Sequence, residues 1–329
     1  MNPQPRVLLL GHGYWGKNLA RNLHAMGVLE GICEPDPAQR AAVALRYPGV
    51  LCYATLEEAL ACSDAPAVAI STPAATHAAL GLRCLEEGRD VFVEKPLALT
   101  VAEGDALVEA ARRHQRILMV GHLLEYHPAV LALRSLVEQG DLGTLQYLYS
   151  NRLNLGRFRR EENILWSFAP HDIAVLLRLV GADPVEVKAF GGAYLRPEVA
   201  DTTVTHLRFP DGVRAHIFVS WLHPYKEQRL VVVGSDQMAV FDDRRPWPEK
   251  LIVHDKGADW QAAEPIPRAG EGRPVPLSEA EPLRAELDHF VACVRDRCTP
   301  RTDGESGVRV LRVLEAAQRS LLAPPTSAP

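Results

Sequence analysis

The stretch LLLGHGYWGKNLARNL, from Leu8 to Leu23, decides the fold of the first part of the chain. Its leucines are typical of a buried strand and the residues after Gly16 of a helix, so the glycines occupy a strand-to-helix turn. Gly11, Gly13 and Gly16 have G-x-G-x-x-G spacing. In that context the first glycine permits the tight turn, the second lets a pyrophosphate approach the backbone, and the third lets helix and strand pack closely. The stretch therefore predicts a dinucleotide site at a helix N-terminus. A glycine-rich turn without a ligand is the plain alternative.

Apolar strands continue to alternate with helices as far as His122. The strand segments after the first are residues 28–34, 50–53, 66–72, 90–94 and 116–122. Short apolar strands separated by helices indicate a parallel sheet that is covered on both faces. Strands in this order fit a doubly wound α/β sheet, and we expect a dinucleotide-binding Rossmann domain over residues 1–122.

The pattern changes in the second part of the chain, where we expect a helix to begin at Pro170. Alternating strands then dominate from residue 185 to 255, with the hairpin turn signal Pro-Asp-Gly at Pro210 to Gly212. The proline-rich segment from Ala263 to Pro276 predicts a loop. Residues 123–329 therefore predict an α+β domain with a large, mostly antiparallel open sheet, which we expect to bind the substrate and to form oligomers.

Glu34 ends the second strand, 18 residues after Gly16. An acidic residue near this distance accepts hydrogen bonds from the adenine ribose hydroxyls and repels a 2′-phosphate, which favours NAD over NADP. Arg40 lies six residues further on and could meet a phosphate, which keeps NADP as an alternative. Candidates to cover the pyrophosphate or ribose follow the fourth strand, and they are Ser71, Thr72, Pro73 and His77. A plain helix residue is an equal alternative for His77.

The fifth strand lies in DVFVEKPLALT, from Asp90 to Thr100, and it ends in Glu94, Lys95 and Pro96. A Lys at the carboxyl end of such a strand projects into the cofactor crevice. Burial disfavours its charge and a neighbouring carboxylate favours it, and a Lys under these opposing influences can exchange a proton with an alcohol. A surface Lys paired with Glu94 is the plain alternative. A methyltransferase that binds S-adenosylmethionine would explain the glycines, but it does not predict this lysine.

These motifs together resemble the glucose–fructose oxidoreductase, inositol dehydrogenase and MocA (Gfo/Idh/MocA) family of oxidoreductases. The likeness extends over essentially the whole chain and is carried by GHGYWG, STPAATH (71–77), EKPLALT (94–100), VGHLLEYHP (120–128) and APHDI (169–173). The resemblance implies that Lys95 lies beside the nicotinamide and the reacting carbinol, and that the peptide bond before Pro96 is cis. The candidate cofactor contacts are Gly11, Gly13, Tyr14, Trp15, Gly16, Glu34, Ser71, Thr72, Pro73, His77, Glu94 and Lys95.

The resemblance also implies a catalytic histidine, which matches His171. The family carries an Asp four residues earlier, where this chain has Ser167, so we expect Lys95 and His171 to share the proton transfer without that carboxylate. The neighbouring Asp172 is predicted to be a first-turn charge favoured by the helix dipole. Many relatives carry Arg where this chain has Leu-Glu at 124–125, which puts a cationic contact there in doubt.

The segment SNRLNLGRFRREENILW (150–166) gathers arginines just before His171. Arginine suits phosphate or carboxylate through bidentate contacts, and a solvated loop of mixed charge is the plain alternative. The candidate substrate contacts are Arg152, Asn154, Arg157, Trp166 and His171. The likeness is to family members that handle sugar nucleotides in polysaccharide assembly, which implies a UDP-sugar oxidised at a ring hydroxyl such as C3. The alternatives are a free polyol or aldose, such as inositol or glucose, and a non-catalytic NAD-binding protein of the same fold.

Composition limits the partners. The net charge of −5 argues against a nucleic-acid partner, and no apolar run approaches the roughly 20 residues needed to cross a membrane. The cysteines and histidines lack metal-site spacing, so no metal is expected. We expect a cytoplasmic homodimer or homotetramer joined through the open face of the second sheet, because a sheet with helices on one side must cover its other face or leave it polar.

Overall fold

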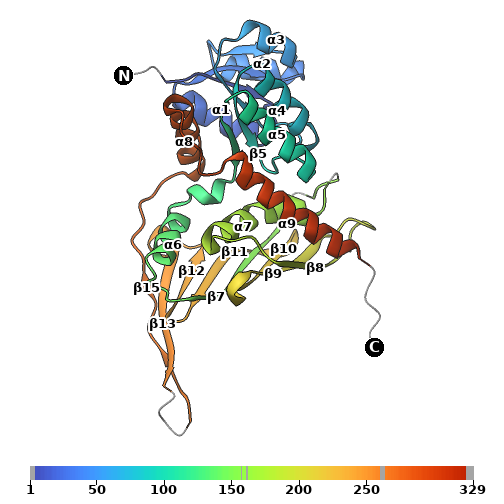
Figure 1. Cartoon of the computed structure of the whole chain (residues 1–329). Coiled ribbons are helices and arrows are strands. Elements are labelled where there is room, and N and C mark those ends of the chain that lie inside the picture. The colour runs from blue at the N-terminus through green and yellow to red at the C-terminus, as the bar shows by residue number, and fades with distance from the viewer. Residues whose placement is uncertain (1–3, 157, 161, 260–263, 324–329) are drawn as a thin grey trace. The chain divides into compact units, whose positions relative to one another are not determined.

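The computed structural model describes residues 4–156, 158–160, 162–259 and 264–323. They form two compact units (Figure 1). Unit 1 comprises Met1–Leu123 and Glu281–Leu311, and unit 2 comprises Leu124–Ala280 and Arg312–Pro329. Within the described part of the chain, no helix combines the length and the apolar character that crossing a membrane requires.

Unit 1 is built on a six-stranded parallel sheet with the strand order β3-β2-β1-β4-β5-β6. The strands are β1 (Val7–Leu10), β2 (Leu29–Cys33), β3 (Leu51–Tyr53), β4 (Ala67–Ile70), β5 (Asp90–Glu94) and β6 (Leu118–Gly121). The helices are α1 (Gly16–Ala25), α2 (Pro37–Arg46), α3 (Leu56–Cys62), α4 (His77–Glu86), α5 (Val101–Arg113), α8 (Pro282–Asp296) and the start of α9 (Gly304–Leu322). The strand order reverses between β1 and β4, and ligands of such sheets bind beyond the carboxyl ends of the strands at this reversal. The predicted doubly wound α/β fold is confirmed.

Local sequence signals explain the elements around β5. This strand is buried along its whole length, as expected for a parallel strand covered on both faces. Thr100 and Glu103 form a reciprocal capping box at the start of α5, in which each side chain accepts a backbone N–H of the other residue. The turn that carries Lys95 is therefore fixed at both of its ends.

The segment Glu281–Leu311 belongs to unit 1, whereas the predicted domains 1–122 and 123–329 placed it in the second domain. Phe290 of α8 packs on Phe92 of β5, with ring centroids 5.7 Å apart. These two rings lie far apart in the sequence. The local sequence of α8 and of α9 does not indicate which of the two sheets each helix covers. Local patterns alone therefore placed the boundary after β6.

Among the described residues, unit 2 is built on a nine-stranded sheet in the order β14-β13-β12-β11-β7-β10-β9-β8, with β15 paired to β13. The strands are β7 (Leu145–Leu155), β8 (Glu186–Gly192), β9 (Thr202–Arg208), β10 (Arg214–Ser220), β11 (Leu222–Gly234), β12 (Gln237–Asp242), β13 (Leu251–Asp259), β14 (Ile266–Ala269) and β15 (Arg273–Pro274). Strands β7 and β10 are parallel and the other described pairs are antiparallel. Helices α6 (Pro128–Glu138) and α7 (Ile164–Val180) cover one face (Figure 1). The predicted α+β domain with a mostly antiparallel sheet is confirmed.

Two loop predictions in unit 2 have different outcomes. The Pro210–Gly212 turn joins the antiparallel strands β9 and β10, and Asp211 and Gly212 have the positive φ angles of 60° and 83° that such a turn needs. The predicted loop from Ala263 to Pro276 is wrong in part, because it contains β14 and β15; Ala263 itself lies outside the described residues. Strand β14 is exposed throughout and pairs only with β13 in the described sheet, so it tolerates the proline at Pro267.

Helix α7 begins earlier than predicted. Asn163 caps it by accepting the backbone N–H of Trp166 at 3.3 Å, and the helix runs unbroken past Pro170 to Val180. Proline inside a helix costs one hydrogen bond, but most residues of α7 are buried, and this packing outweighs the cost. Asp172 therefore lies in the middle of the helix, and its prediction as a first-turn charge is wrong.

Candidate active site

The glycine loop between β1 and α1 has the geometry of a phosphate cradle. Gly11 has a φ of +88°, and its carbonyl accepts the Ser71 hydroxyl at 2.8 Å. A Cβ on Gly16 would lie 2.2 Å from the carbonyl oxygen of Gly11, so only glycine allows this approach of helix to strand. A Cβ on Gly13 would meet no heavy atom within 4 Å, so the loop leaves room for a ligand there. The residues present therefore fit the pyrophosphate of a dinucleotide at the start of α1.

Glu34, directly after β2, is held in place by backbone donors. Its carboxylate accepts the N–H of His12 at 2.8 Å and the N–H of Asp36 at 3.1 Å. Arg40 donates to the carbonyl oxygens of Glu34 and Pro35 at 2.7 and 2.8 Å. One guanidinium nitrogen thus supports the loop that carries Glu34, which leaves less of Arg40 for a 2′-phosphate.

The segment after β4 is connected to the turn after β5. The ring nitrogens of His77 lie 2.8 Å from the carbonyl oxygen of Pro96 and 2.9 Å from that of Thr72. His77 is 1% exposed. The ring therefore joins the two loops through their backbones, and a direct contact between His77 and the cofactor stays a prediction. The carbonyl of Pro73 accepts the N–H of Thr76 at 2.9 Å and closes the intervening turn.

The strand end at Glu94 and Lys95 combines burial with directed hydrogen bonds. The predicted cis bond between Lys95 and Pro96 is present. Glu94 is buried, and its carboxylate accepts the Trp15 indole N–H at 2.5 Å and the Lys95 backbone N–H at 3.3 Å. Burial raises the pKa of Glu94 to about 7, against the opposing effects of the Trp15 hydrogen bond and the Lys95 charge. Lys95 is half-buried, whereas Tyr14 of the glycine loop is 75% exposed.

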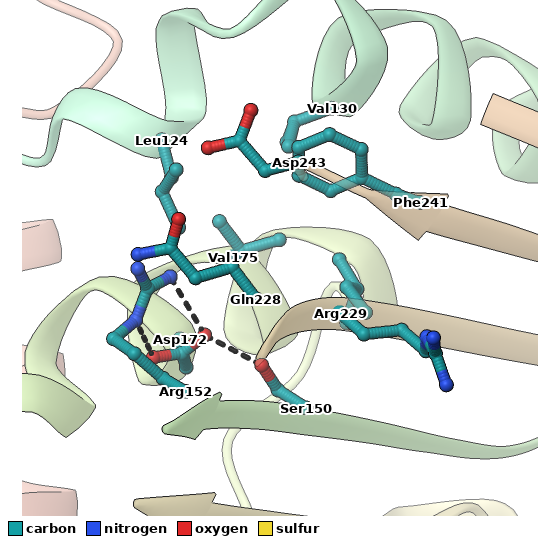
Figure 2. Close-up of a pocket in the computed structure, with 11 residues that line it drawn as sticks. Leu124, Val130, Ser150, Arg152, Asp172, Val175, Gln228, Arg229, Phe241 and Asp243 are labelled. Atoms are coloured by element: carbon teal, nitrogen blue, oxygen red, sulfur yellow. Dashed lines mark hydrogen bonds and ion pairs between the residues drawn. The ribbon is translucent and has the colours of Figure 1, made fainter. Parts of the chain in front are cut away.

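Unit 2 has a small pocket between its sheet and the helices α6 and α7 (Figure 2). Its walls are Leu124, Val130, Ser150, Arg152, Asp172, Val175, Gln228, Arg229, Leu230, Phe241 and Asp243. Its volume of about 20 Å³ holds about one water molecule and not a sugar ring. The pocket is therefore described by the hydrogen bonds and ion pairs among the polar side chains that line it.

Arg152 and Asp172 form a buried ion pair in this pocket (Figure 2). The guanidinium donates to both carboxylate oxygens, at 2.7 and 3.1 Å, and Ser150 donates to the same carboxylate at 2.5 Å. Sequence reasoning did not find this group. The signal was available in β7, where Ser150 and Arg152 are two residues apart and so share one face of the strand. Arg152 therefore meets a carboxylate of its own chain, which any substrate phosphate would have to share or displace.

The remaining candidates in unit 2 are only partly placed. Asn154 is half-buried, and its side-chain oxygen has no hydrogen-bond partner among the described residues. The indole N–H of Trp166 donates to Gln318 at 3.1 Å. His171 is half-buried on α7, one turn after the buried Ser167, and the unbroken helix puts both on one face. Arg157 lies outside the described residues.

Leu124 and Glu125 carry no positive charge themselves, but an arginine of another helix lies beside Glu125. Glu125 is buried and accepts a hydrogen bond from Arg178 of α7 at 2.8 Å. His127 caps α6, and its ring stacks on Trp247 with centroids 5.4 Å apart. Arg178 of α7 therefore supplies the positive charge that Glu125 meets.

Two family models match the chain. The model described as "Oxidoreductase family, NAD-binding Rossmann fold" matches residues 5–122, and the "GFO/IDH/MocA C-terminal domain" matches residues 130–240. The first match lies in unit 1 and the second in unit 2.

Proteins of known activity are similar over nearly the whole chain. UDP-N-acetylglucosamine 3-dehydrogenase of Acidithiobacillus ferrooxidans is 28% identical over 307 residues, which cover 93% of this chain and 94% of that protein. The scyllo-inositol 2-dehydrogenase (NAD(+)) of Bacillus subtilis is 26% identical over 314 residues, which cover 91% of this chain and 89% of that protein.

Solved structures give the same result. That of the A. ferrooxidans enzyme has a TM-score of 0.85 at 26% identity and covers 96% of this chain and 97% of its own. The WlbA dehydrogenase of Bordetella pertussis, solved with NADH and UDP-GlcNAcA, has a TM-score of 0.79 at 23% identity, covers 97% and 96%, and shares the fold. With its glycine cradle, its Glu34 and its lysine-bearing strand end, this chain belongs to the Gfo/Idh/MocA family and is an NAD-binding oxidoreductase.

Proposed function

We propose that the protein oxidises a ring hydroxyl of a UDP-linked sugar, at C3, and passes the hydride to NAD. The observation that carries the proposal is the strand end itself, where Lys95 follows a buried carboxylate tied to the glycine loop. The similarity to a UDP-N-acetylglucosamine 3-dehydrogenase over 93% of this chain supports the substrate class. A role in polysaccharide assembly in the cytoplasm is part of this proposal.

In this proposal, some residues of unit 1 bind the cofactor and Lys95 transfers a proton. Bound NAD supplies the hydride acceptor. The N–H groups at the start of α1 hold the pyrophosphate, and Glu34 accepts hydrogen bonds from the adenine ribose. Lys95 takes the proton of the carbinol, because its charge is disfavoured by partial burial and favoured by Glu94, so that it can exist in both protonation states.

In unit 2, the proposed acid–base residue is His171. His171 shares the proton transfer, without the carboxylate that the family places where this chain has Ser167. Ser167 cannot act as a strong base, so the acid–base chemistry depends on His171 and Lys95.

The proposed diphosphate contacts are Arg152 and Arg157, with Asn154 and Trp166 at the sugar or base. Because Asp172 already holds two nitrogens of Arg152, we expect Arg157→Ala to weaken UDP-sugar binding more than Arg152→Ala does. Loss of a hydrogen bond to a charged group costs about 1.5–3 kcal/mol, or roughly ten- to hundredfold in affinity.

A free polyol or aldose is the second candidate, favoured by the similarity to a scyllo-inositol 2-dehydrogenase. The test is NADH formation from NAD with UDP-N-acetylglucosamine, its uronic acid, inositol and glucose. The proposal expects turnover with a UDP-sugar and a much lower kcat/KM for the unlinked compounds. Turnover of inositol or glucose alone would establish the second candidate, and NAD binding without any turnover would indicate a non-catalytic relative.

The proposed assembly is a homodimer or homotetramer joined through the face of the unit 2 sheet that α6 and α7 leave uncovered. Ser150 points to α7, so Tyr147 and Tyr149 point to the other face. Tyr147 is 46% exposed there, and Phe190, in register on the same face, is 66% exposed. Large exposed aromatic residues on one sheet face are typical of an interface.

A further inference from the structure

Trp15 and Glu94 connect two motifs that lie 79 residues apart in the chain. Trp15 stands between Gly13 and Gly16 in the glycine loop, and Glu94 directly precedes Lys95. The indole N–H of Trp15 donates to the Glu94 carboxylate at 2.5 Å. One hydrogen bond thus joins the loop that holds the cofactor to the strand end that carries the candidate acid–base residue.

The Glu94 carboxylate is confined on its other sides as well. Its second oxygen accepts the Lys95 backbone N–H at 3.3 Å. Gly121 pairs with Glu94 across β5 and β6, and a Cβ on Gly121 would lie 2.9 Å from that oxygen. The carboxylate therefore has little room to turn, and Trp15 is the side chain that fixes its first oxygen.

We propose that Trp15 is a positioning residue of the acid–base site: its indole N–H orients the Glu94 carboxylate and stabilises its charge next to Lys95. This inference rests on the proposed role of Lys95. A carboxylate beside an amine favours the ammonium form, so Trp15 acts on the proton carrier through Glu94. The glycine loop then contributes to proton transfer as well as to cofactor binding.

The electrostatics of the described residues agree with this role. Burial raises the pKa of Glu94 to about 7, and the Trp15 hydrogen bond lowers it more than the Lys95 charge does. Lys95 is the charged residue that acts on the carboxylate, while Trp15 and the backbone of Gly121 are uncharged. His122 follows Gly121, is buried and carries a second ionisable side chain next to the residue that pairs with Glu94. A test must therefore separate Glu94 from His122.

Magnetic resonance of ¹⁵N-labelled tryptophan side chains tests the bond without any turnover. We expect one indole signal, absent from Trp15→Phe, to shift with a midpoint near pH 7. The same signal should stay constant in Glu94→Gln, because the amide does not ionise and His122 is still present. If Trp15→Phe does not fold, Glu94→Gln alone identifies the signal, since it must displace one indole resonance and abolish its titration.

The chain supplies its own matched controls. The indole of Trp221 donates to buried Asp201 at 2.5 Å, and hydrogen bonds lower the pKa of that carboxyl. The indole of Trp166 donates to the amide of Gln318. Neither acceptor changes its charge between about pH 5.5 and 8.5, so neither signal should titrate there through its acceptor.

Turnover as a function of pH then tests the consequence for the site. Phe keeps a ring at position 15 and removes the N–H donor, so the pKa of Glu94 should rise and the midpoint near pH 7 should move up by about one to two pH units. In Glu94→Gln this midpoint should vanish from the profile.

An indole signal of Trp15 that does not titrate, or that titrates unchanged in Glu94→Gln, overturns the inference. An unmoved midpoint in the turnover of Trp15→Phe does so as well. The proposed function fails separately, if Lys95→Met keeps its turnover, and the resonance experiment is unaffected by that outcome.

Discussion

At the scale of the residue, Glu34 is the side chain that we expect to set the preference between NAD and NADP. Its carboxylate lies at the end of β2, where it accepts two backbone N–H groups. We expect a lower dissociation constant for NAD than for NADP, because a 2′-phosphate would meet this negative charge. Titration with both cofactors measures the preference, and Glu34→Gln should reduce it. Tighter binding of NADP by the unaltered protein would refute the role given to Glu34.

Glu94 should make the stability of the fold depend on pH. Its pKa is raised from 4.5 to about 7 in the folded state, so between these values the folded protein binds more protons than the unfolded one. The contribution of Glu94 to the free energy of unfolding is therefore complete below about pH 4.5 and falls by about 3 kcal/mol as the pH rises past 7.

Chemical unfolding at several pH values checks this slope. Glu94→Gln should remove it. Asp201→Asn is the matched control, because Asp201 is also buried and also bonded to an indole, but its pKa is lowered from 3.8, so its own window lies below that pH. Equal slopes in Glu94→Gln and the unaltered protein would contradict the assignment.

At the scale of the element, the pair of Arg152 and Asp172 fastens α7 to β7. Removing one partner of a buried ion pair leaves an uncompensated charge and costs about 3–5 kcal/mol. We expect Arg152→Met and Asp172→Leu each to lower the free energy of unfolding by about this amount, and the double variant to lose less than their sum. Denaturant titration of the three variants gives the coupling. Additive losses of unfolding free energy would show that the two side chains act independently. Arg152 could then bind the substrate without breaking a stabilising pair with Asp172.

Helix α7 also shows why some elements escaped prediction from sequence. Pro170 is a local signal for a helix start, and it was outweighed by the burial of the residues on both sides of it, which is a property of the whole unit. Asp172 was misplaced for the same reason. The strand end at Glu94, Lys95 and Pro96 was predicted correctly, because apolar run, charge and proline are all local.

At the scale of the whole molecule, the features that could be predicted from the sequence were those that residues close together in the chain determine. The order of strands and helices in unit 1 and the antiparallel pattern in unit 2 follow from periodicity and turns. The return of α8 to unit 1 does not, because it depends on contacts such as that between Phe290 and Phe92. The Trp15–Glu94 hydrogen bond belongs to the same class: both residues were candidates, and only the fold brings them together.

We expect the protein to form a homodimer or homotetramer through the uncovered face of the unit 2 sheet. We expect a mass by light scattering of at least twice 36.2 kDa at micromolar concentration. Phe190→Glu should shift the protein toward the monomer, because it places a charge among exposed aromatic side chains. A monomer in the unaltered protein would remove this interface.

The central claim is that Lys95 carries the proton of the reacting carbinol. The most direct measurement compares turnover and NAD binding in Lys95→Met, which keeps the length of the side chain and removes the amine, with those in His171→Ala. Turnover of Lys95→Met should fall by about 10²- to 10⁴-fold, the usual contribution of a general acid–base group, while NAD affinity changes little because the glycine loop holds the phosphates. Near-normal turnover in Lys95→Met, with a loss in His171→Ala, would contradict the account and leave His171 as the sole acid–base group.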